Sequence, residues 1–552
     1  MNKLVKKSII NFCNLNFIQK VILIIISLIF LFLFIQNFVF SSSFDILMFR
    51  AVDDFAFQHS LRKNHEAIVH FKIHHLFRLY DYGYGWLFWI IHILITFPFY
   101  LISLLGLDFL LISTARNISL FFMAGSCFFL FKSIKKYTND KYIPYFVILL
   151  FVSYPYFAYS AMSFRTIAPA SFFCILTFYI TIRNDKFTKQ DLKYIALSLA
   201  ACLGIKLSTG LLAPLISLFL LDRFSWRLNK KNIKNAFYFL KYFIPSSIFF
   251  INPSLFISPF KWPLFSDYWK VISGYLNDVK TNHGSGGDFL INFKGGFLTQ
   301  FLFKYILVII VALFILKIFF DLRDKKKQNR FDFLYVLIFL IGSSLLLSNY
   351  IKMGAGYITN YFFSFAFLII LPLTILDKLK SNKVRISILT ILLISNFFLN
   401  FPTIKYNYLE HYNRYYSEKT QNLIKSQKEL QGLIVDSNQK LNLLIDYRAP
   451  VIYSNFRKNI TITSLFDNII VVLKWSNPEY DYILLHRDSK LFLNKEEFQE
   501  DVKQADDYFK EIWIQSREII ASIIKTGQFQ NSKYQIIYDK NELILFKKIG
   551  II

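Results

Sequence analysis

Long apolar stretches separated by short polar loops make up the chain from residue 21 to residue 402. The first stretch, at 21–40, reads VILIIISLIFLFLFIQNFVF. Others follow at 110–131, 142–161, 166–182, 194–221, 235–252, 298–320, 331–349, 357–376 and 386–402. A helix of about 20 apolar residues is long enough to span the hydrocarbon core of a bilayer. The pattern therefore predicts a polytopic α-helical membrane protein.

Basic residues gather in the short loops between these stretches. The basic loops are 132–141, 183–193, 222–234, 321–330 and 377–385. Loops rich in Lys and Arg stay in the cytoplasm. The amino-terminal run has a basic flank, and we expect it to be a retained anchor with a cytoplasmic N-terminus. With all five loops inside, four regions face outward. These are loop 41–109, loop 253–297, the turn 349–357 and everything after residue 402.

This topology requires two segments to make no net crossing. The stretch WLFWIIHILITFPFYLISLL at 86–105 is then expected to lie along, or dip into, the outer interface, a depth that suits its tryptophans. The stretch at 194–221 is interrupted by GIKLSTG and is expected to form two short helices bent around Lys206 to Gly210. The alternative, in which both segments span once, leaves several Lys-rich loops outside.

The last part of the chain, 403–552, has a different pattern. A polar helical stretch is followed by the short β-rich runs LNLLIDY, ITITSLF and YDYILLH, an amphipathic region at 497–525 and the closing YQIIYDKNELILFKK, which predicts a hairpin with its turn at Asp-Lys-Asn-Glu. We therefore expect a transmembrane module at 1–402 and an extracytoplasmic α/β domain at 403–552.

Composition changes this picture little. The 552 residues are 55% hydrophobic and carry a formal net charge of +27. A charge of that size can indicate nucleic-acid binding, but here it lies in loops where it sets membrane orientation, so no nucleic-acid partner is expected. The four cysteines, Cys13, Cys127, Cys174 and Cys202, suggest neither a disulfide framework nor a zinc site.

Two adjacent carboxylates, Asp53 and Asp54, follow the first apolar stretch in AVDDFAFQHSLRK. Such a pair is usually a solvated loop feature, but it lies at the membrane exit. Histidine and arginine are concentrated after it, namely His59, Arg62, His65, His70, His74, His75 and Arg78. Transfer to a hydroxyl or amine needs a general base, and a departing phosphate needs cations. The loop is therefore a candidate site for chemistry on a lipid-borne substrate.

Further cations lie at the predicted outer helix ends: Arg116, Arg165, Lys206 and Lys352. Lys206 stands inside an apolar segment, where an ionisable residue is expensive and often functional, although snorkelling to the interface explains it equally well. The second outer loop contributes His283 beside a Gly-Ser-Gly-Gly hinge, as a gating loop or an ordinary connector.

The order of these features resembles the type C glycosyltransferases, membrane enzymes that include the protein O-mannosyltransferases and the lipid A aminoarabinose transferases. The matching pieces are Asp53-Asp54, DYGYGWLFWIIHIL, TARNISL, LGIKLSTGLLAP, FINPSLFISPF and the closing hairpin. The chain departs from the family in RTIAPA, which has no carboxylate, and at Asn360-Tyr361, where many members have Arg before the Tyr.

The resemblance implies a glycosyltransferase that takes a sugar from a polyprenyl-phosphate donor on the outer face, without a certain cofactor and with a divalent metal possible. Asp53 or Asp54 would be the catalytic base or a carboxylate that positions the acceptor. Contacts with donor phosphate or substrate are expected from Lys206, Arg165, Arg78, His75, Lys352 and His283. The acceptor would be a glycan, lipid or protein, and the protein would lie in a bacterial inner or plasma membrane.

Two other functions remain open at this point. A glycolipid transporter or flippase would often show paired halves of similar sequence, which this chain lacks. A polysaccharide polymerase or ligase would concentrate Arg and His in a large middle loop. An enzyme of the first kind requires Asp53 or Asp54, Lys206 and loop 253–297 to converge on one outer cavity.

Overall fold

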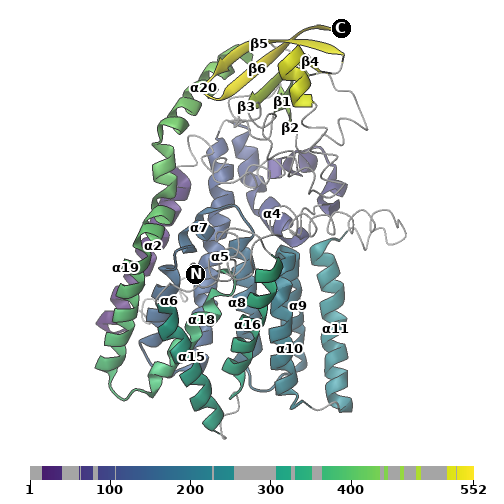
Figure 1. Ribbon diagram of the computed structural model, residues 1–552. Helices are drawn as coiled ribbons and strands as arrows, with labels where there is room; N and C mark the ends of the chain where they lie inside the picture. The colour runs from purple at the N-terminus through teal and green to yellow at the C-terminus, as the bar shows by residue number, and fades with distance from the viewer. Residues whose placement is uncertain are drawn as a thin grey trace, which may run out of the picture.

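The computed structural model shows a helical bundle with a β-sheet at one end (Figure 1). The residues that it describes are 15–39, 61–62, 64–78, 85–105, 107–226, 229–253, 306–324, 330–350, 363–434, 441–445, 460–464, 480–486, 519–529 and 531–551. This architecture confirms the predicted fold class, a polytopic α-helical membrane protein with an α/β region at its C-terminal end.

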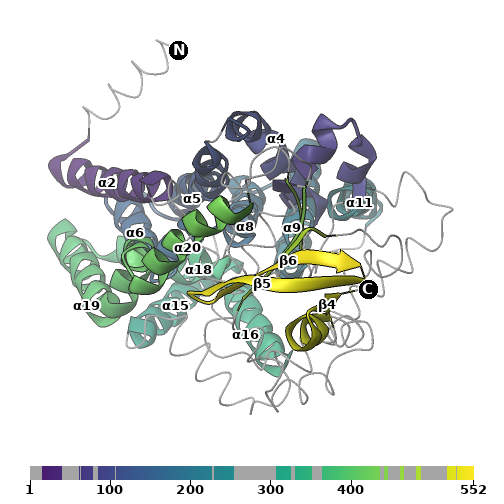
Figure 2. The same cartoon turned by 90° about the horizontal axis from the view of Figure 1, so that it is seen from above.

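The bundle is built from helices of very different length. They are α2 (Phe17–Val39), α4 (Trp86–Ser103), α5 (Asp108–Tyr137), α6 (Ile143–Val152), α7 (Phe157–Met162), α8 (Ile167–Arg183), α9 (Lys189–Ile205), α10 (Leu212–Arg223), α11 (Lys230–Ile251), α15 (Ile306–Arg323), α16 (Asp332–Tyr350), α18 (Ala366–Ile370) and α19 (Asn382–Tyr415), with 3-10 segments η2 (Ile73–Arg78), η3 (Leu207–Leu211) and η5 (Leu371–Lys378). Seen from above, α2, α5, α8, α9 and α11 follow one another in a row, and α19, α15 and α16 form a second row (Figure 2).

Several bundle helices are suited to a bilayer. Within the described residues, four are long and apolar enough to cross a membrane: Phe17–Val39, Trp86–Ser103, Phe109–Tyr137 and Asn382–Leu409. Large apolar side chains of α2, such as Leu28 and Leu31, are more than half exposed in the isolated chain. Their burial requires lipid, because exposed apolar surface is unfavourable in water. The chain is an integral membrane protein.

The described parts of the five basic loops lie at one end of the bundle, which we call the basic end. Three ion pairs join loops that are distant in sequence: Lys136–Asp185 at 2.7 Å, Arg223–Asp332 at 3.0 Å and Arg385–Asp140 at 3.1 Å. Tyr137 also donates a hydrogen bond to Asp332 at 2.8 Å. The relative placement of these loops agrees with the topology expected from their charge.

The segment predicted to turn back does so. Helix α9 begins at the basic end, where Asp191 accepts hydrogen bonds from Arg183, and α10 returns there at Arg223. Between them the chain leaves the helix at Lys206, whose backbone is extended, and turns through η3. The interruption GIKLSTG therefore forms a bend. The Thr209 hydroxyl donates a hydrogen bond to the carbonyl of Lys206 at 2.7 Å and so satisfies that carbonyl where the helix ends.

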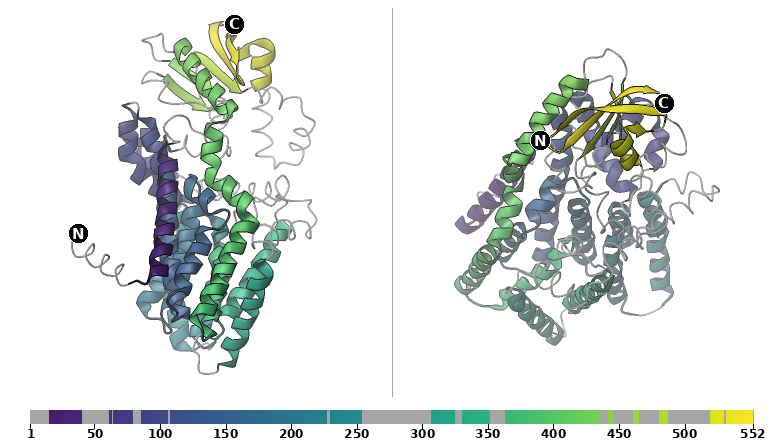
Figure 3. Two further views of the ribbon diagram at one scale, coloured as in Figure 1. Left: turned by 90° about the vertical axis from the view of Figure 1, so that its left-hand side faces the viewer. Right: turned by 45° about the horizontal axis from the view of Figure 1, so that its top comes forward.

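The predicted crossing at 142–161 is divided into α6 and α7 by a turn at 153–156. Side chains of α19 hold this turn: Asn396 donates to Ser153 Oγ at 3.0 Å, and Asn407 donates to the carbonyl of Pro155 at 2.6 Å. Helix α19 contains Pro402 between these two asparagines and ends at Tyr415, from where α20 (Glu418–Ile434) leads to the sheet (Figure 3).

The C-terminal sheet has six strands in the order β2-β1-β3-β6-β5-β4. The strands are β1 (Leu441–Ile445), β2 (Ile460–Ser464), β3 (Tyr482–His486), β4 (Gln528–Phe529), β5 (Ser532–Lys540) and β6 (Leu543–Ile551). Strands β2, β1 and β3 are parallel, whereas β6, β5 and β4 run antiparallel. The three β-rich runs of the sequence are the parallel strands.

Alternating side chains cover both faces of the sheet. Leu443 and Leu545 pack with α20 (Glu418–Ile434) on one face, and Leu444 and Ile520 belong to the cluster on the other. Such alternation follows from the two-residue period of a strand. The predicted hairpin is present as β5 and β6, with Asn541 and Glu542 at positive φ in its turn.

Candidate functional site

The end of the bundle opposite the basic end, which we call the sheet end, contains the start of α5, the start of α8 and the end of α9. Helix α4 lies against all three. Its Phe88, Trp89 and Ile93 are buried with Leu111 of α5, Ala170 of α8 and Ile205 of α9 in one apolar cluster. Helix α4 therefore packs at the ends of these three helices.

Close backbone packing fixes the start of α4. Gly85, the last residue of DYGYG, lies so near Gly204 that a Cβ at Gly85 would clash with the Gly204 carbonyl oxygen. A Cβ at Gly204 would in turn clash with Phe250 of α11. Trp86 packs against Phe249, with ring centroids 5.1 Å apart. Gly85 of DYGYG, Gly204 of LGIK and Phe250 of FINP therefore meet at the sheet end, because only glycine permits this approach.

A short helical segment at 64–69 packs on α4 through His65. The Thr96 hydroxyl donates to the carbonyl of His92 at 2.6 Å, so its oxygen accepts from His65 Nε2 at 3.1 Å. The carbonyl of Ile93 also accepts from His65 Nε2, at 3.2 Å. Burial lowers the pKa of His65 to about 4, and the positive charge of Arg62 contributes to this lowering. His65 is therefore neutral at pH 7.

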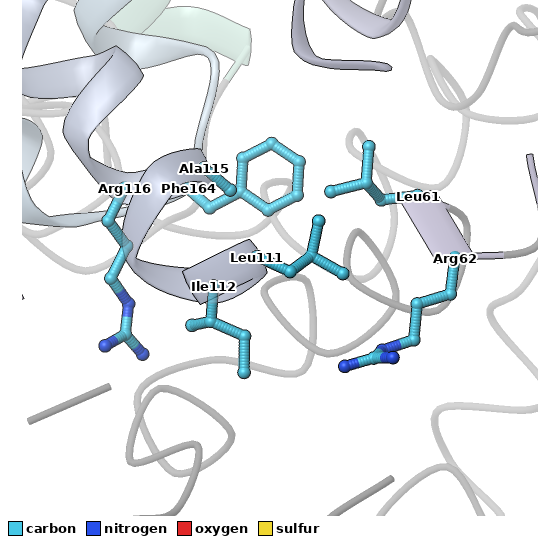
Figure 4. A pocket seen from close by; sticks show the side chains of 7 residues that line it. All are labelled: Leu61, Arg62, Leu111, Ile112, Ala115, Arg116 and Phe164. Carbon is cyan, nitrogen blue, oxygen red and sulfur yellow. The ribbon is translucent and has the colours of Figure 1, made fainter. Parts of the chain in front are cut away.

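Two buried arginines line a small pocket next to this helix. Arg116 of α5 is completely buried and Arg62 is 9% exposed. Figure 4 shows their guanidinium groups on either side of an apolar wall and directed to the same side of it. The wall is formed by Leu61, Leu111, Ile112, Ala115 and Phe164. Arginine in such a position suits phosphate, because its planar donors match phosphate oxygens.

Phe164 connects the pocket to α4. Its ring lies 5.8 Å from Phe88 and 4.8 Å from His92, measured between centroids. The ring of His92 is fixed in turn, since its Nδ1 donates to the carbonyl of Phe88 at 2.7 Å. The pocket wall is thus held by a helix that the sequence places at the membrane interface.

Four positively charged residues share one relation to the apolar cluster: each directly follows a member of it in sequence. The pairs are Leu61–Arg62, Ala115–Arg116, Phe164–Arg165 and Ile205–Lys206. Because the four apolar partners belong to one cluster, the backbone segments that carry the four cations lie near one another, and Arg62 and Arg116 line the pocket. We call Arg62, Arg116, Arg165 and Lys206 the cation group.

Two of the predicted site residues belong to this group. Lys206 and Arg165 are both half-buried, and Arg165 lies 5.7 Å from the ring centroid of Tyr159. Asp53, Asp54, Lys352 and His283 lie outside the described residues. For Arg78 and His75 the structure describes only the backbone, in η2.

Arg62 and Arg116 were named among the cations of the sequence but were not chosen as phosphate contacts. They lie in the motifs AVDDFAFQHSLRK and TARNISL. A buried arginine within an apolar helix is itself an indication of function. Among the described residues, no group of three His, Cys, Asp or Glu side chains could hold a metal ion. The predicted carboxylates Asp53 and Asp54 are not in that part of the chain.

No family model matches the sequence, and no curated protein matches it. Solved structures of similar fold include two crystal structures of ArnT from Cupriavidus metallidurans. The structure bound to undecaprenyl phosphate has a TM-score of 0.45 and 10% sequence identity, and the apo structure has a TM-score of 0.44 and 11% identity. Each similarity covers 84% of this chain and 88% of the other. At this level, activity has to be argued from the residues of the chain itself.

Proposed function

We propose that the chain is a glycosyltransferase that moves a sugar from a polyprenyl-phosphate donor to an acceptor on the extracytoplasmic face of the membrane. The observation that supports this most is the cation group around one apolar cluster at the sheet end. A polyprenyl phosphate combines an anionic head with an apolar chain, and this arrangement offers a partner to each.

The chemistry assigns the cation group to the leaving group. When the bond from the sugar to the phosphate oxygen breaks, negative charge builds on the polyprenyl phosphate. Buried arginines stabilise that charge more strongly than exposed ones, because little water screens them. Arg62 and Arg116 are the most buried members of the group. The wall between them, which includes Leu111 and Phe164, would contact the first isoprene units.

The acceptor hydroxyl or amine needs a base, for which Asp53 and Asp54 are proposed. They precede Arg62 by nine and eight residues in sequence. Val39, before them, is at the end of α2 where Phe38 packs on Phe109 of α5. Leu61, after them, packs on Leu111 of the same helix. Both ends of the intervening chain thus lie beside the cation group.

Arg78, His75, Lys352 and His283 remain proposed donor or substrate contacts. In the same proposal, residues 1–402 are the catalytic module with its basic end in the cytoplasm. Residues 403–552 form the extracytoplasmic part and meet a glycan, lipid or protein acceptor. The membrane would be a bacterial inner or plasma membrane.

The test measures sugar transfer by the purified protein from a set of polyprenyl-phosphate sugars. Arg116→Gln is expected to lower kcat/KM by about 100-fold, the usual size for loss of one stabilising donor. Lys132→Gln, an exposed residue at the opposite end of the same helix, is the matched control and should retain activity. Equal activity of the two folded variants would place the phosphate elsewhere.

The base is located by Asp53→Asn and Asp54→Asn in the same assay. One of them should abolish transfer while binding of polyprenyl phosphate is unchanged. If both variants transfer sugar like the wild type, the acidic pair is a solvated loop feature. Translocation of the lipid-linked sugar without transfer would instead identify a transporter.

A further inference from the structure

Helices α9 and α11 pack side by side at the edge of the bundle (Figures 1 and 2) and carry lysines along their basic-end halves. These lysines are Lys189, Lys193, Lys230, Lys231, Lys234 and Lys241. All are exposed except Lys193, which is half-buried. We call them the lysine face.

Two of these lysines are held in place by aromatic rings. Lys189 Nζ lies 6.0 Å from the ring centroid of Tyr238, and Lys193 Nζ lies 5.2 Å from that of Tyr242. The two tyrosine rings are themselves only 5.1 Å apart. Cation–π contacts of this kind orient an ammonium group without neutralising it. The two charges are therefore presented one helical turn apart on α9.

The lysine face retains its charge. Helix α11 contains no Asp or Glu. The two carboxylates near the start of α9 bind other cations, since Asp185 pairs with Lys136 and Asp191 with Arg183. Within the described residues, no carboxylate lies within ion-pair distance of a lysine of this face. Uncompensated charge of one sign attracts an anionic partner.

The rest of this surface is apolar and aromatic. On α11, Phe237 is 70% exposed and Leu240 is 41% exposed, between Lys234 and Lys241. Trp226, at the turn before α11 and beside Tyr335 of α16, is 55% exposed at the same end of the bundle. Tryptophan prefers the depth of lipid headgroups, and lysine stems extend along apolar surface towards them. The surface thus combines an acyl-chain contact with a cationic rim.

We propose that the lysine face, with Tyr238 and Tyr242, binds the headgroup of an anionic phospholipid in the leaflet at the basic end. Lys189 and Lys193 contact the phosphate, and Lys234 and Lys241 contact it from the neighbouring helix. The acyl chains lie on the apolar residues of α11. This site is distinct from the cation group, which lies at the other end of the bundle.

Native mass spectrometry of the detergent-solubilised full chain tests the proposal. Phosphatidylglycerol is titrated in, with phosphatidylcholine as the zwitterionic comparison. The wild type should retain phosphatidylglycerol preferentially. Lys189→Gln combined with Lys193→Gln should weaken its binding about thirtyfold, at about fivefold for each lysine near an anionic lipid.

Matched controls separate a site from general charge. Lys378→Gln combined with Lys380→Gln removes two exposed lysines from the same end and should leave binding unchanged. Tyr242→Leu keeps every charge and should weaken binding severalfold, because Lys193 is no longer oriented. Equal retention by wild type and the Lys189/Lys193 variant, or equal loss in the Lys378/Lys380 control, overturns the proposal. Arg116→Gln should bind phosphatidylglycerol normally whether or not it transfers sugar.

Discussion

The two ends of the bundle use buried charge in opposite ways. At the basic end, Arg223 is paired with Asp332 between helices that are far apart in sequence, and both side chains are almost completely buried. At the sheet end, Arg62 and Arg116 stand on either side of an apolar wall that lines a pocket. The first arrangement is an ion pair between two helices, and the second lines a pocket.

The difference shows that burial of an arginine does not by itself indicate its role. A buried ion pair adds little net stability compared with apolar packing, but removing one partner leaves the other charge uncompensated. The basic end therefore fixes which loops are neighbours. The sheet end is held by the close approach of Gly85 and Gly204 and by the aromatic contacts of Phe164.

The largest effect should come from breaking the Arg223–Asp332 ion pair. Arg223→Gln leaves Asp332 buried without its cation and should lower the free energy of unfolding by about 3–5 kcal/mol. Thermal and denaturant unfolding in detergent measure this loss. Arg223→Gln with Asp332→Asn should recover part of it. A stable Arg223→Gln variant with impaired sugar transfer would contradict the distinction between the two ends.

A smaller effect should appear at the sheet end on acidification. His65 has a pKa of about 4 in the fold and about 6.5 when unfolded, so its neutral form stabilises the segment above pH 6.5. That stabilisation is lost as the pH falls from 6.5 towards 4, by about 2 kcal/mol at pH 5. Hydrogen exchange of the amides of residues 64–69, corrected for intrinsic rates, should report it.

His65→Gln should flatten that pH dependence, whereas His70→Gln, at an exposed position close by, should not. His92 is the other titratable group in this polar cluster, through Thr96, and a residual slope in His65→Gln would be assigned to it. An unchanged pH dependence in His65→Gln would show that the segment is held by other contacts.

The smallest effect belongs to the basic end. The Thr188 hydroxyl caps α9 by accepting a hydrogen bond from the amide of Asp191 at 3.1 Å. The Asp191 carboxylate in turn accepts a hydrogen bond from the Thr188 amide. Thr188→Ala should cost about 1 kcal/mol of stability, and Thr188→Ser should cost less. Urea or thermal unfolding distinguishes them. A loss as large as that in Arg223→Gln would mean that the cap also fixes the Arg183–Asp191 pair.

Much of the fold could be predicted because its signals are local. The turning back at Lys206 followed from basic loops on both sides of one interrupted apolar stretch. The final hairpin followed from alternation around Asp-Lys-Asn-Glu. The division of the crossing at 142–161 was missed because the asparagines that satisfy the turn lie on α19, more than 240 residues later.

The site was predicted only in part for the same reason. Lys206 and Arg165 were selected because each stands at an interruption or helix end visible in the sequence. Choosing Arg62 and Arg116 among many cations required knowing that Leu61 packs beside Ala115. That contact joins segments more than 50 residues apart, and no pattern along the chain encodes it.

Helix α19 has a mechanical consequence. The helix is about 50 Å long, at 1.5 Å per residue over its 34 residues. It is expected to bend most easily at Pro402, which removes a backbone hydrogen bond. Asn396 and Asn407 lie on either side of Pro402. Both side chains donate hydrogen bonds to the same turn, at Ser153 and Pro155. Both contacts hold α19 against the bundle on either side of Pro402, and they therefore oppose bending of the helix at that proline.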